Sequence, residues 1–264
     1  MKIIFFSLLI FMPCFSQAQH VQSNTSLLKK AFQKIGSYKF DRYGDGSNDS
    51  LNAFNDDFER LLLRITSVDP NSISQPFNEL KKLGLHIATA DDGNFRIYSW
   101  DDQTGGTMRY FRSVFQFKSK GQIQSTTINT DKSIDEDGKF YKEIFQVNAK
   151  DKTYYLVYGI FTGSTAIHLH NLKAFSISDG ALGRVRIIKT KTGLKNQLGY
   201  EVDYSDSDNR PSVIDINETL VQYDPKTQSI SFPLIQESGK ITEKKSDTVL
   251  MGNTLKRFNY PLIC

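Results

Sequence analysis

The sequence has very little cysteine and tryptophan and no long block of like charge. Among its 264 residues are two cysteines, Cys14 and Cys264, and one tryptophan, Trp100. We expect the segment that holds Cys14 to be removed, so no disulfide can form within the mature chain and packing must hold the core together. Lysine, arginine, aspartate and glutamate are interspersed, with a formal net charge of +4. This pattern gives no basic footprint for nucleic acid.

The one long apolar run, Ile3 to Met12, lies at the amino end. Lys2 precedes it, and the small residues of Ser16-Gln17-Ala18 follow it, as in a secretory signal peptide. A bilayer-spanning helix needs about 20 apolar residues, so the run is too short to be a transmembrane segment. Pro13 stands before Cys14 where a lipid-attachment motif has a small residue, which disfavours a lipid anchor. We expect cleavage after Ala18 and a periplasmic or secreted mature protein.

Three segments near the amino terminus have apolar residues at helical spacing. The first runs from Thr25 to Ile35, and the second from Ser50 to Thr66, where six apolar side chains form one face. The third begins after Ser74, as the amino-terminal cap, and ends at Gly84, as the carboxyl-terminal cap. The sequence therefore predicts a helical segment over residues 19–84.

From Leu85 onward the apolar residues recur with a period of two, which is typical of strands. Turn pairs such as Asp137-Gly138 and Asp179-Gly180 interrupt the pattern every 8 to 14 residues or so. About a dozen strands with short connections indicate antiparallel pairing. We predict a β-rich domain over residues 85–264.

The predicted fold class is α+β, with the amino-terminal helices packed on a large, mostly antiparallel β-sheet domain. A sandwich and a partly closed barrel are both compatible with this pattern. A weak similarity between Asp91–Ser99 and Asp151–Gly159 also leaves a propeller open. A repeat of about 60 residues is long for a propeller blade of about 40 to 50 residues, so the propeller is the less favoured alternative.

The stretch from Asp91 to Lys118 predicts a β-hairpin around Trp100. Its first strand alternates, with Phe95 and Ile97 on one side and Tyr98 and Trp100 on the other. Thr104-Gly105-Gly106 is expected to supply the positive φ that the turn needs.

Aromatic and arginine side chains gather in this hairpin, and such surfaces stack on sugars or peptides. The alternative is that Trp100 belongs to the core and the arginines are ordinary outward residues. The predicted ligand-binding residues are Arg96, Tyr98, Trp100, Asp101, Arg109 and Tyr110.

His168-Leu169-His170 predicts two imidazoles on one face of a strand, which is a spacing that zinc sites on sheets use. No third ligand lies nearby in the sequence. The alternative is a half-exposed strand that carries two histidines on its polar side, with Ile167, Leu169 and Leu172 facing inward. His168 and His170 are the candidate metal ligands.

The loop before the second helix places Asp45, Ser47, Asp49 and Asp56 at positions 1, 3, 5 and 12 of a possible calcium loop. Ser50 stands where such a loop needs glycine. The alternative is a solvated loop that caps the helix. No cofactor is therefore predicted, with zinc or calcium left as possibilities.

No signature of nucleophilic catalysis and no phosphate-binding loop is present in the sequence. Whether the protein is an enzyme is therefore left open. We predict an exported, non-enzymatic binding or interaction protein of the cell envelope whose partner is a glycan, a peptide or an envelope protein. The alternative is a metal-dependent hydrolase that uses the strand site at His168 and His170.

Overall fold

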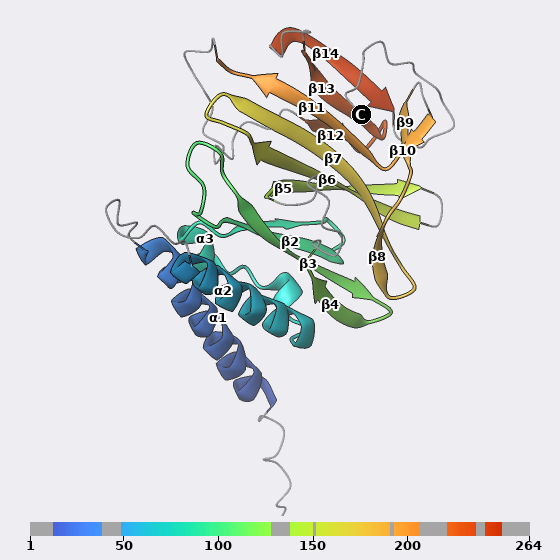
Figure 1. Cartoon of the computed structure of the whole chain (residues 1–264). Helices are drawn as coiled ribbons and strands as arrows, with labels where there is room; N and C mark the ends of the chain where they lie inside the picture. Colours follow the sequence, from blue (N-terminus) through green and yellow to red (C-terminus); the bar gives the residue numbers. More distant parts are fainter. Residues whose placement is uncertain are drawn as a thin grey trace, which may run out of the picture.

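A computed structural model describes residues 13–38, 49–127, 138–149, 152–190, 193–205, 221–235 and 241–249. The amino-terminal helices form one layer, and antiparallel sheets are stacked above them (Figure 1). The α+β class is confirmed, with helices packed against a sandwich of sheets.

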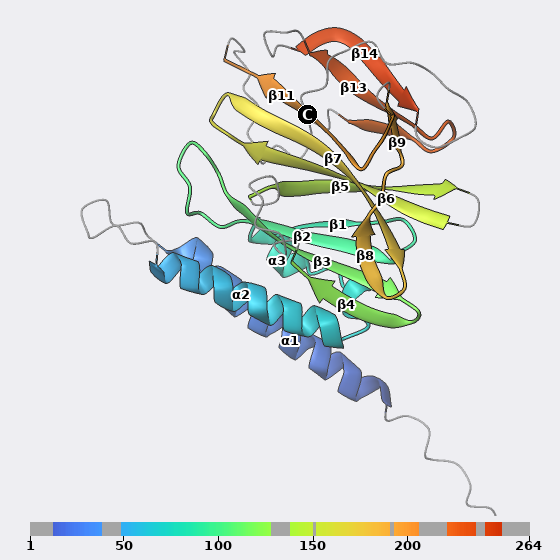
Figure 2. The same cartoon turned by 45° about the vertical axis from the view of Figure 1, so that its right-hand side comes forward.

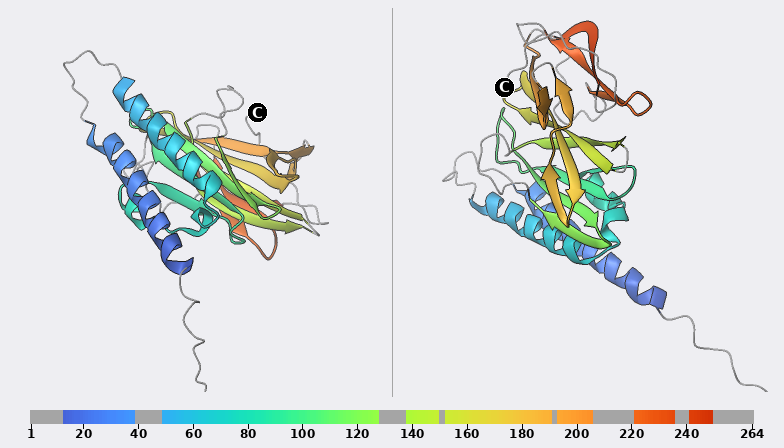
Figure 3. Two further views of the ribbon diagram at one scale, coloured as in Figure 1. Left: turned by 90° about the horizontal axis from the view of Figure 1, so that it is seen from below. Right: turned by 90° about the vertical axis from the view of Figure 1, so that its right-hand side faces the viewer.

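The helical layer consists of three α-helices and one turn of 3-10 helix. The second predicted helix is confirmed, because α2 buries the apolar face that begins at Leu51. The first predicted helix lies within a longer helix, α1, which also includes the expected cleavage point after Ala18. Helices α1 and α2 lie side by side beneath the sheets (Figure 3). The bounds are Pro13–Ser37 for α1, Asp49–Val68 for α2, Ser72–Ser74 for the 3-10 helix η1 and Asn78–Lys82 for α3.

The third predicted helix is shorter than expected, and its predicted cap is wrong. Ser74 ends η1 instead of capping α3, and the residue before α3 is Phe77, whose φ is 46°. Phe77 holds this left-handed backbone because its ring is buried against Tyr98, with ring centres 6.0 Å apart. The predicted end is confirmed: Gly84 has φ +106°, and Leu85 N–H donates to the Leu80 carbonyl.

Four strands form the sheet next to the helices, in the order β1-β2-β3-β4. The predicted hairpin is its centre, since β2 pairs with β3 from Phe95↔Phe117 to Asp101↔Phe111. The bounds are His86–Thr89 for β1, Phe95–Asp101 for β2, Phe111–Ser119 for β3 and Gln122–Thr126 for β4.

The middle sheet has the order β11-β7-β6-β5, with β8 paired to the far end of β7. The turn from β7 to β8 is the predicted Asp179-Gly180 pair, and both residues have positive φ. The bounds are Phe140–Ala149 for β5, Lys152–Thr162 for β6, Ile167–Ser178 for β7, Ala181–Arg184 for β8 and Gln197–Asp203 for β11.

The outer layer is a sheet of order β12-β13-β14, accompanied by the small pair β9 and β10 (Figure 2). The bounds are Ile188–Thr190 for β9, Gly193–Lys195 for β10, Gln222–Asp224 for β12, Ser229–Ile235 for β13 and Ile241–Val249 for β14. The strand predicted at 254–259 lies outside the described residues.

The layers explain why the central strands are buried on both faces. On β2, Tyr98 and Trp100 face the helices, whereas Phe95 and Ile97 face the middle sheet. The middle sheet in turn packs its other face against the outer sheet, where Phe232 of β13 lies. The described strands therefore form a stacked sandwich, with one core between each pair of layers.

The helical segment and the β-rich segment share a core. Leu28 of α1 and Phe58 of α2 belong to the same cluster as Trp100 and Val114 of the first sheet. The chain does change from helices to strands at Leu85, but the helices cover a sheet that would otherwise expose its aromatic face. None of the described helices is long and apolar enough to cross a membrane.

Candidate functional site

The six side chains predicted to share one binding surface are divided by the fold. Arg96, Tyr98 and Trp100 are buried where the first sheet packs against the helical layer, and Trp100 is 0% exposed. The exposure that a contact surface needs is therefore absent at these three positions, and that part of the prediction is wrong. The remaining three, Asp101, Arg109 and Tyr110, lie at the end of the hairpin.

Arg96 and Tyr98 attach the first sheet to the segment between α2 and α3. The Arg96 guanidinium donates to the Ser72 and Gln75 carbonyls at 3.2 and 2.6 Å. The Tyr98 hydroxyl donates to Gln116 Oε1 at 2.7 Å, and burial raises the pKa of Tyr98 to about 12. Both polar groups are satisfied by the protein itself, so their role is structural.

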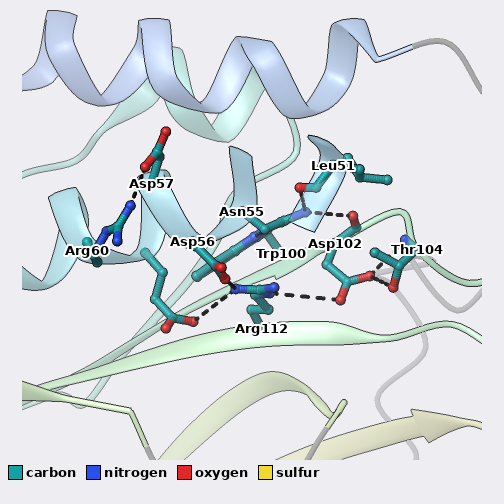
Figure 4. Close-up of polar contacts among 10 residues, drawn as sticks. Leu51, Asn55, Asp56, Asp57, Arg60, Trp100, Asp102, Thr104 and Arg112 are labelled. Atoms are coloured by element: carbon teal, nitrogen blue, oxygen red, sulfur yellow. Dashed lines mark hydrogen bonds and ion pairs between the residues drawn. The ribbon is translucent and has the colours of Figure 1, made fainter. Parts of the chain in front are cut away.

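Trp100 is held by Asn55 of α2 (Figure 4). Trp100 Nε1 donates to Asn55 Oδ1 at 2.9 Å. The Asn55 amide nitrogen donates to the carbonyls of Leu51 and Asp102, both at 2.9 Å. One buried side chain thus fixes α2 against the end of β2.

Arg112 of β3 lies among three carboxylates beside this contact (Figure 4). It is 2.5 Å from Asp56 and 3.9 Å from both Glu59 and Asp102. Burial raises the pKa of Glu59 and of Asp102, although Arg112 opposes both shifts. Arg112 offsets part of the negative charge where the helix meets the sheet, and we assign the group to stability.

The β2–β3 connection, residues 102–110, takes a different course from the predicted turn. Its positive φ falls on Gln103, at 61°, and not on the glycine pair. Glycine is required at 105 for another reason, because a Cβ there would lie 2.1 Å from the Met108 carbonyl oxygen. Arg109 Nη1 pairs with Asp101 at 2.6 Å, and Arg109 N–H donates to the Thr162 carbonyl at 3.3 Å. The connection is therefore tied to the β6–β7 hairpin.

Exposed side chains lie close to one another where the connection reaches the β6–β7 hairpin. Met108, Tyr110 and Leu169 are exposed, at 38%, 42% and 40%. Tyr110 and Phe161 both approach Gly138, and Phe161 pairs with Leu169 across β6 and β7. Cross-strand partners have neighbouring side chains on one face. We call Met108, Tyr110 and Leu169, together with Arg109, the end patch.

His168 and His170 lie on one face of β7, as predicted, but that face is the buried one. Each histidine is 3% exposed, whereas Leu169 between them points outward. The alternative with Leu169 inward is therefore wrong, although Leu172 is buried on the same face as the histidines. The outer sheet covers this face, which the sequence could not reveal.

Aromatic rings enclose the two histidines. His170 stacks between Tyr200 and Tyr158, with ring centres 5.0 and 5.9 Å away, and its Nδ1 is 2.6 Å from the Tyr158 hydroxyl oxygen. His168 packs on Tyr204 at 5.2 Å. Burial lowers the pKa of His168, and it lowers the pKa of His170 to about 3, so both rings are neutral near pH 7.

Three buried polar atoms on this face have no hydrogen-bond partner: Nε2 of His168, Nε2 of His170 and Oγ1 of Thr162. The Tyr200 hydroxyl lies beside them and is hydrogen-bonded to Tyr158. An unpaired buried donor or acceptor costs about 1–3 kcal/mol. Thr162 and Tyr200 were missed by sequence reasoning, since only strand pairing brings them to the histidines, through Thr162↔His168 and Tyr200↔His170.

The described residues contain no group of three or more His, Cys, Asp or Glu side chains that could hold a metal ion. Asp45 and Ser47 of the possible calcium loop lie outside the described residues. Asp49 begins α2, and Asp56 is paired with Arg112. Asp49 and Asp56, the acidic residues of that loop that the structure describes, therefore have structural roles.

Comparison with known proteins gives no relative. No protein-family model, no curated protein and no solved structure matches the chain. The function must therefore be argued from the chain's own residues.

Proposed function

We propose that the protein is an exported, non-enzymatic binding or interaction protein of the cell envelope, and that the end patch is its contact surface. The observation that carries the proposal is that three exposed side chains, Met108, Tyr110 and Leu169, lie at one end of the sheets, beside the Arg109–Asp101 ion pair. Met108 and Tyr110 lie in the β2–β3 connection, and Leu169 lies on β7 of the middle sheet. Tyrosine and arginine are the residue types that contribute most to binding energy in protein interfaces.

The proposal keeps Asp101, Arg109 and Tyr110 from the predicted site and replaces the buried residues with Met108 and Leu169. Asp101 fixes the Arg109 side chain, which reduces the entropy lost when a partner binds. Arg109 is half-exposed even in this pair. The surface therefore offers apolar area and one positioned cation, which suits a glycan, a peptide or an envelope protein.

Substitutions at the end patch are expected to weaken binding without unfolding the protein. The purified mature protein is screened against a glycan array and a displayed peptide library, and each ligand found is titrated against variants. Tyr110→Ala and Leu169→Thr should each raise Kd at least tenfold, which corresponds to about 1.4 kcal/mol. Leu194→Thr is the matched control, because Leu194 is a 49% exposed leucine on β10. A ligand that binds all variants equally would rule out the end patch.

Export is tested separately by amino-terminal sequencing. When the full chain is produced in a bacterial host, we expect the protein recovered from the envelope fraction or the medium to begin at Gln19. Cleavage after Ala18 would also shorten α1, which includes this residue. Recovery of an uncleaved chain from the cytoplasm would contradict the export proposal.

A further inference from the structure

The unpaired polar atoms on the covered face of the middle sheet form one continuous group. Thr162 is the Cα partner of His168, and Tyr200 is the Cα partner of His170, so the four residues are neighbours on β6, β7 and β11. They share the face that packs against the outer sheet, where Phe232 meets Tyr200 at 5.9 Å. We call these four residues the polar floor.

We propose that the polar floor binds a small uncharged polyhydroxyl ligand, of the sugar or polyol class, between the middle and outer sheets. Buried polar groups in folded proteins are almost always hydrogen-bonded. Here the two Nε2 atoms and Thr162 Oγ1 are buried without a hydrogen-bond partner. The Tyr200 hydroxyl, which is hydrogen-bonded to Tyr158, lies beside them. A ligand with several hydroxyl groups would provide the missing partners.

The charge state of the polar floor favours a neutral ligand. Threonine, tyrosine and neutral histidine side chains each have both donor and acceptor capacity, as a hydroxyl group has. Among the residues that the structure describes, Lys142 of β5 interacts with His170, and Glu143 of the same strand interacts with Lys142. Within this described part of the chain, a charged ligand would lose its hydration without gaining an uncommitted counter-charge.

Aromatic rings flank the histidines of the polar floor. Tyr158 and Tyr200 stand on either side of His170, and Tyr204 packs on His168. Ligand pockets combine apolar and aromatic lining with a few placed polar groups. A sugar matches this lining, because it carries C–H faces as well as hydroxyl groups.

The geometry disfavours a metal ion at the same residues. The ring centres of His168 and His170 are 6.4 Å apart. A tetrahedral zinc ion held by both Nε2 atoms at about 2.0–2.1 Å would place the ring centres about 5 Å apart. The neighbours across the strands are threonine and tyrosine, which are not the carboxylate, thiolate or imidazole ligands that zinc requires.

The polar floor lies at the end of the middle sheet that carries the end patch. Thr162 is the last residue of β6, and His168 is the second residue of β7. The turn between them includes the exposed Thr165. Leu169 of the end patch points from the opposite face of the same strand. The inference therefore goes beyond the proposed function, and it does not depend on binding at the end patch.

The test is a titration of the full mature protein with glucose, galactose, mannose, N-acetylglucosamine and glycerol, with citrate and zinc chloride as competing ligand classes. The readouts are Kd from calorimetry and the ¹⁵N shifts of His168 and His170 Nε2. We expect one of the neutral compounds to bind and to move both Nε2 signals. Thr162→Val, which keeps the shape and removes the hydroxyl, should raise its Kd at least tenfold, while Thr165→Val should leave it unchanged.

Three results would overturn the proposal. Stoichiometric zinc binding that is lost in His170→Ala would indicate a metal site instead. Citrate binding that moves both Nε2 signals would indicate an anion site. If none of the neutral compounds binds, the polar floor does not bind a ligand of the proposed class. Tyr110→Ala separates this site from the end patch, since it should leave sugar binding at the polar floor unchanged.

Discussion

Replacing Asn55 with alanine is expected to lower the free energy of unfolding by about 2–4 kcal/mol. The substitution leaves the buried Trp100 Nε1–H and the Asp102 carbonyl without their partners. Each unpaired buried group costs about 1–3 kcal/mol. Chemical denaturation of the mature protein measures the loss directly, and a loss of this size is a large share of the stability of a typical domain.

A matched control and a double-mutant cycle separate this contact from the helix itself. Asn52→Ala changes an exposed asparagine of the same helix and should shift stability by less than about 0.5 kcal/mol. In a Trp100→Phe background, which lacks the indole donor, Asn55→Ala should cost less than in the wild-type protein. Equal costs in both backgrounds would show that the indole hydrogen bond contributes nothing.

Acidification is expected to destabilise the protein through His170. Burial lowers the pKa of His170 to about 3 in the folded protein, whereas an unfolded chain has a histidine pKa of about 6.5. Above pH 6.5 both states hold the ring neutral, and the stability is fully present. Below it the unfolded chain binds a proton that the folded protein excludes, so stability falls by about 1.4 kcal/mol per pH unit. Between pH 7 and pH 5 the loss is about 2 kcal/mol.

The variant His170→Phe isolates this contribution, because it keeps an aromatic ring and removes the titrating group. Urea unfolding at intervals from pH 7.5 to pH 5 should give a shallower pH dependence for the variant, by about one proton. Burial also lowers the pKa of His168, which remains in both proteins. Burial raises the pKa of Glu59, Asp102 and Glu143, which adds stability as the pH falls, equally in both. Identical slopes for the two proteins would contradict the prediction.

Local patterns in the sequence were sufficient for most elements of the fold. The apolar spacing from Leu51 onward predicts α2, because a helix brings every third or fourth side chain to one face. The alternation around Trp100 predicts β2 and its two faces, because successive side chains of a strand point to opposite sides. The Asp179-Gly180 pair predicts the turn after β7, because glycine and aspartate tolerate positive φ.

The candidate site could be predicted only in part, because exposure depends on layers that are distant in sequence. Trp100 has the same local pattern whether its face is open or covered, and α2 covers it. His168 and Leu169 illustrate the reverse case. The strand predicts that they point to opposite sides, but the outer sheet decides that the histidine is buried and the leucine is exposed.

By itself the sequence determined the change from helices to antiparallel strands at Leu85 and the residues that share each strand face. These follow from backbone geometry and hydrophobic periodicity over a few residues. The tertiary structure alone decided that the Trp100 face is core, that Tyr110 and Leu169 lie at the same end of the sheets, and that Thr162 and Tyr200 join the histidines. Those relations depend on strand pairing and layer stacking, which bring together residues that no local pattern links.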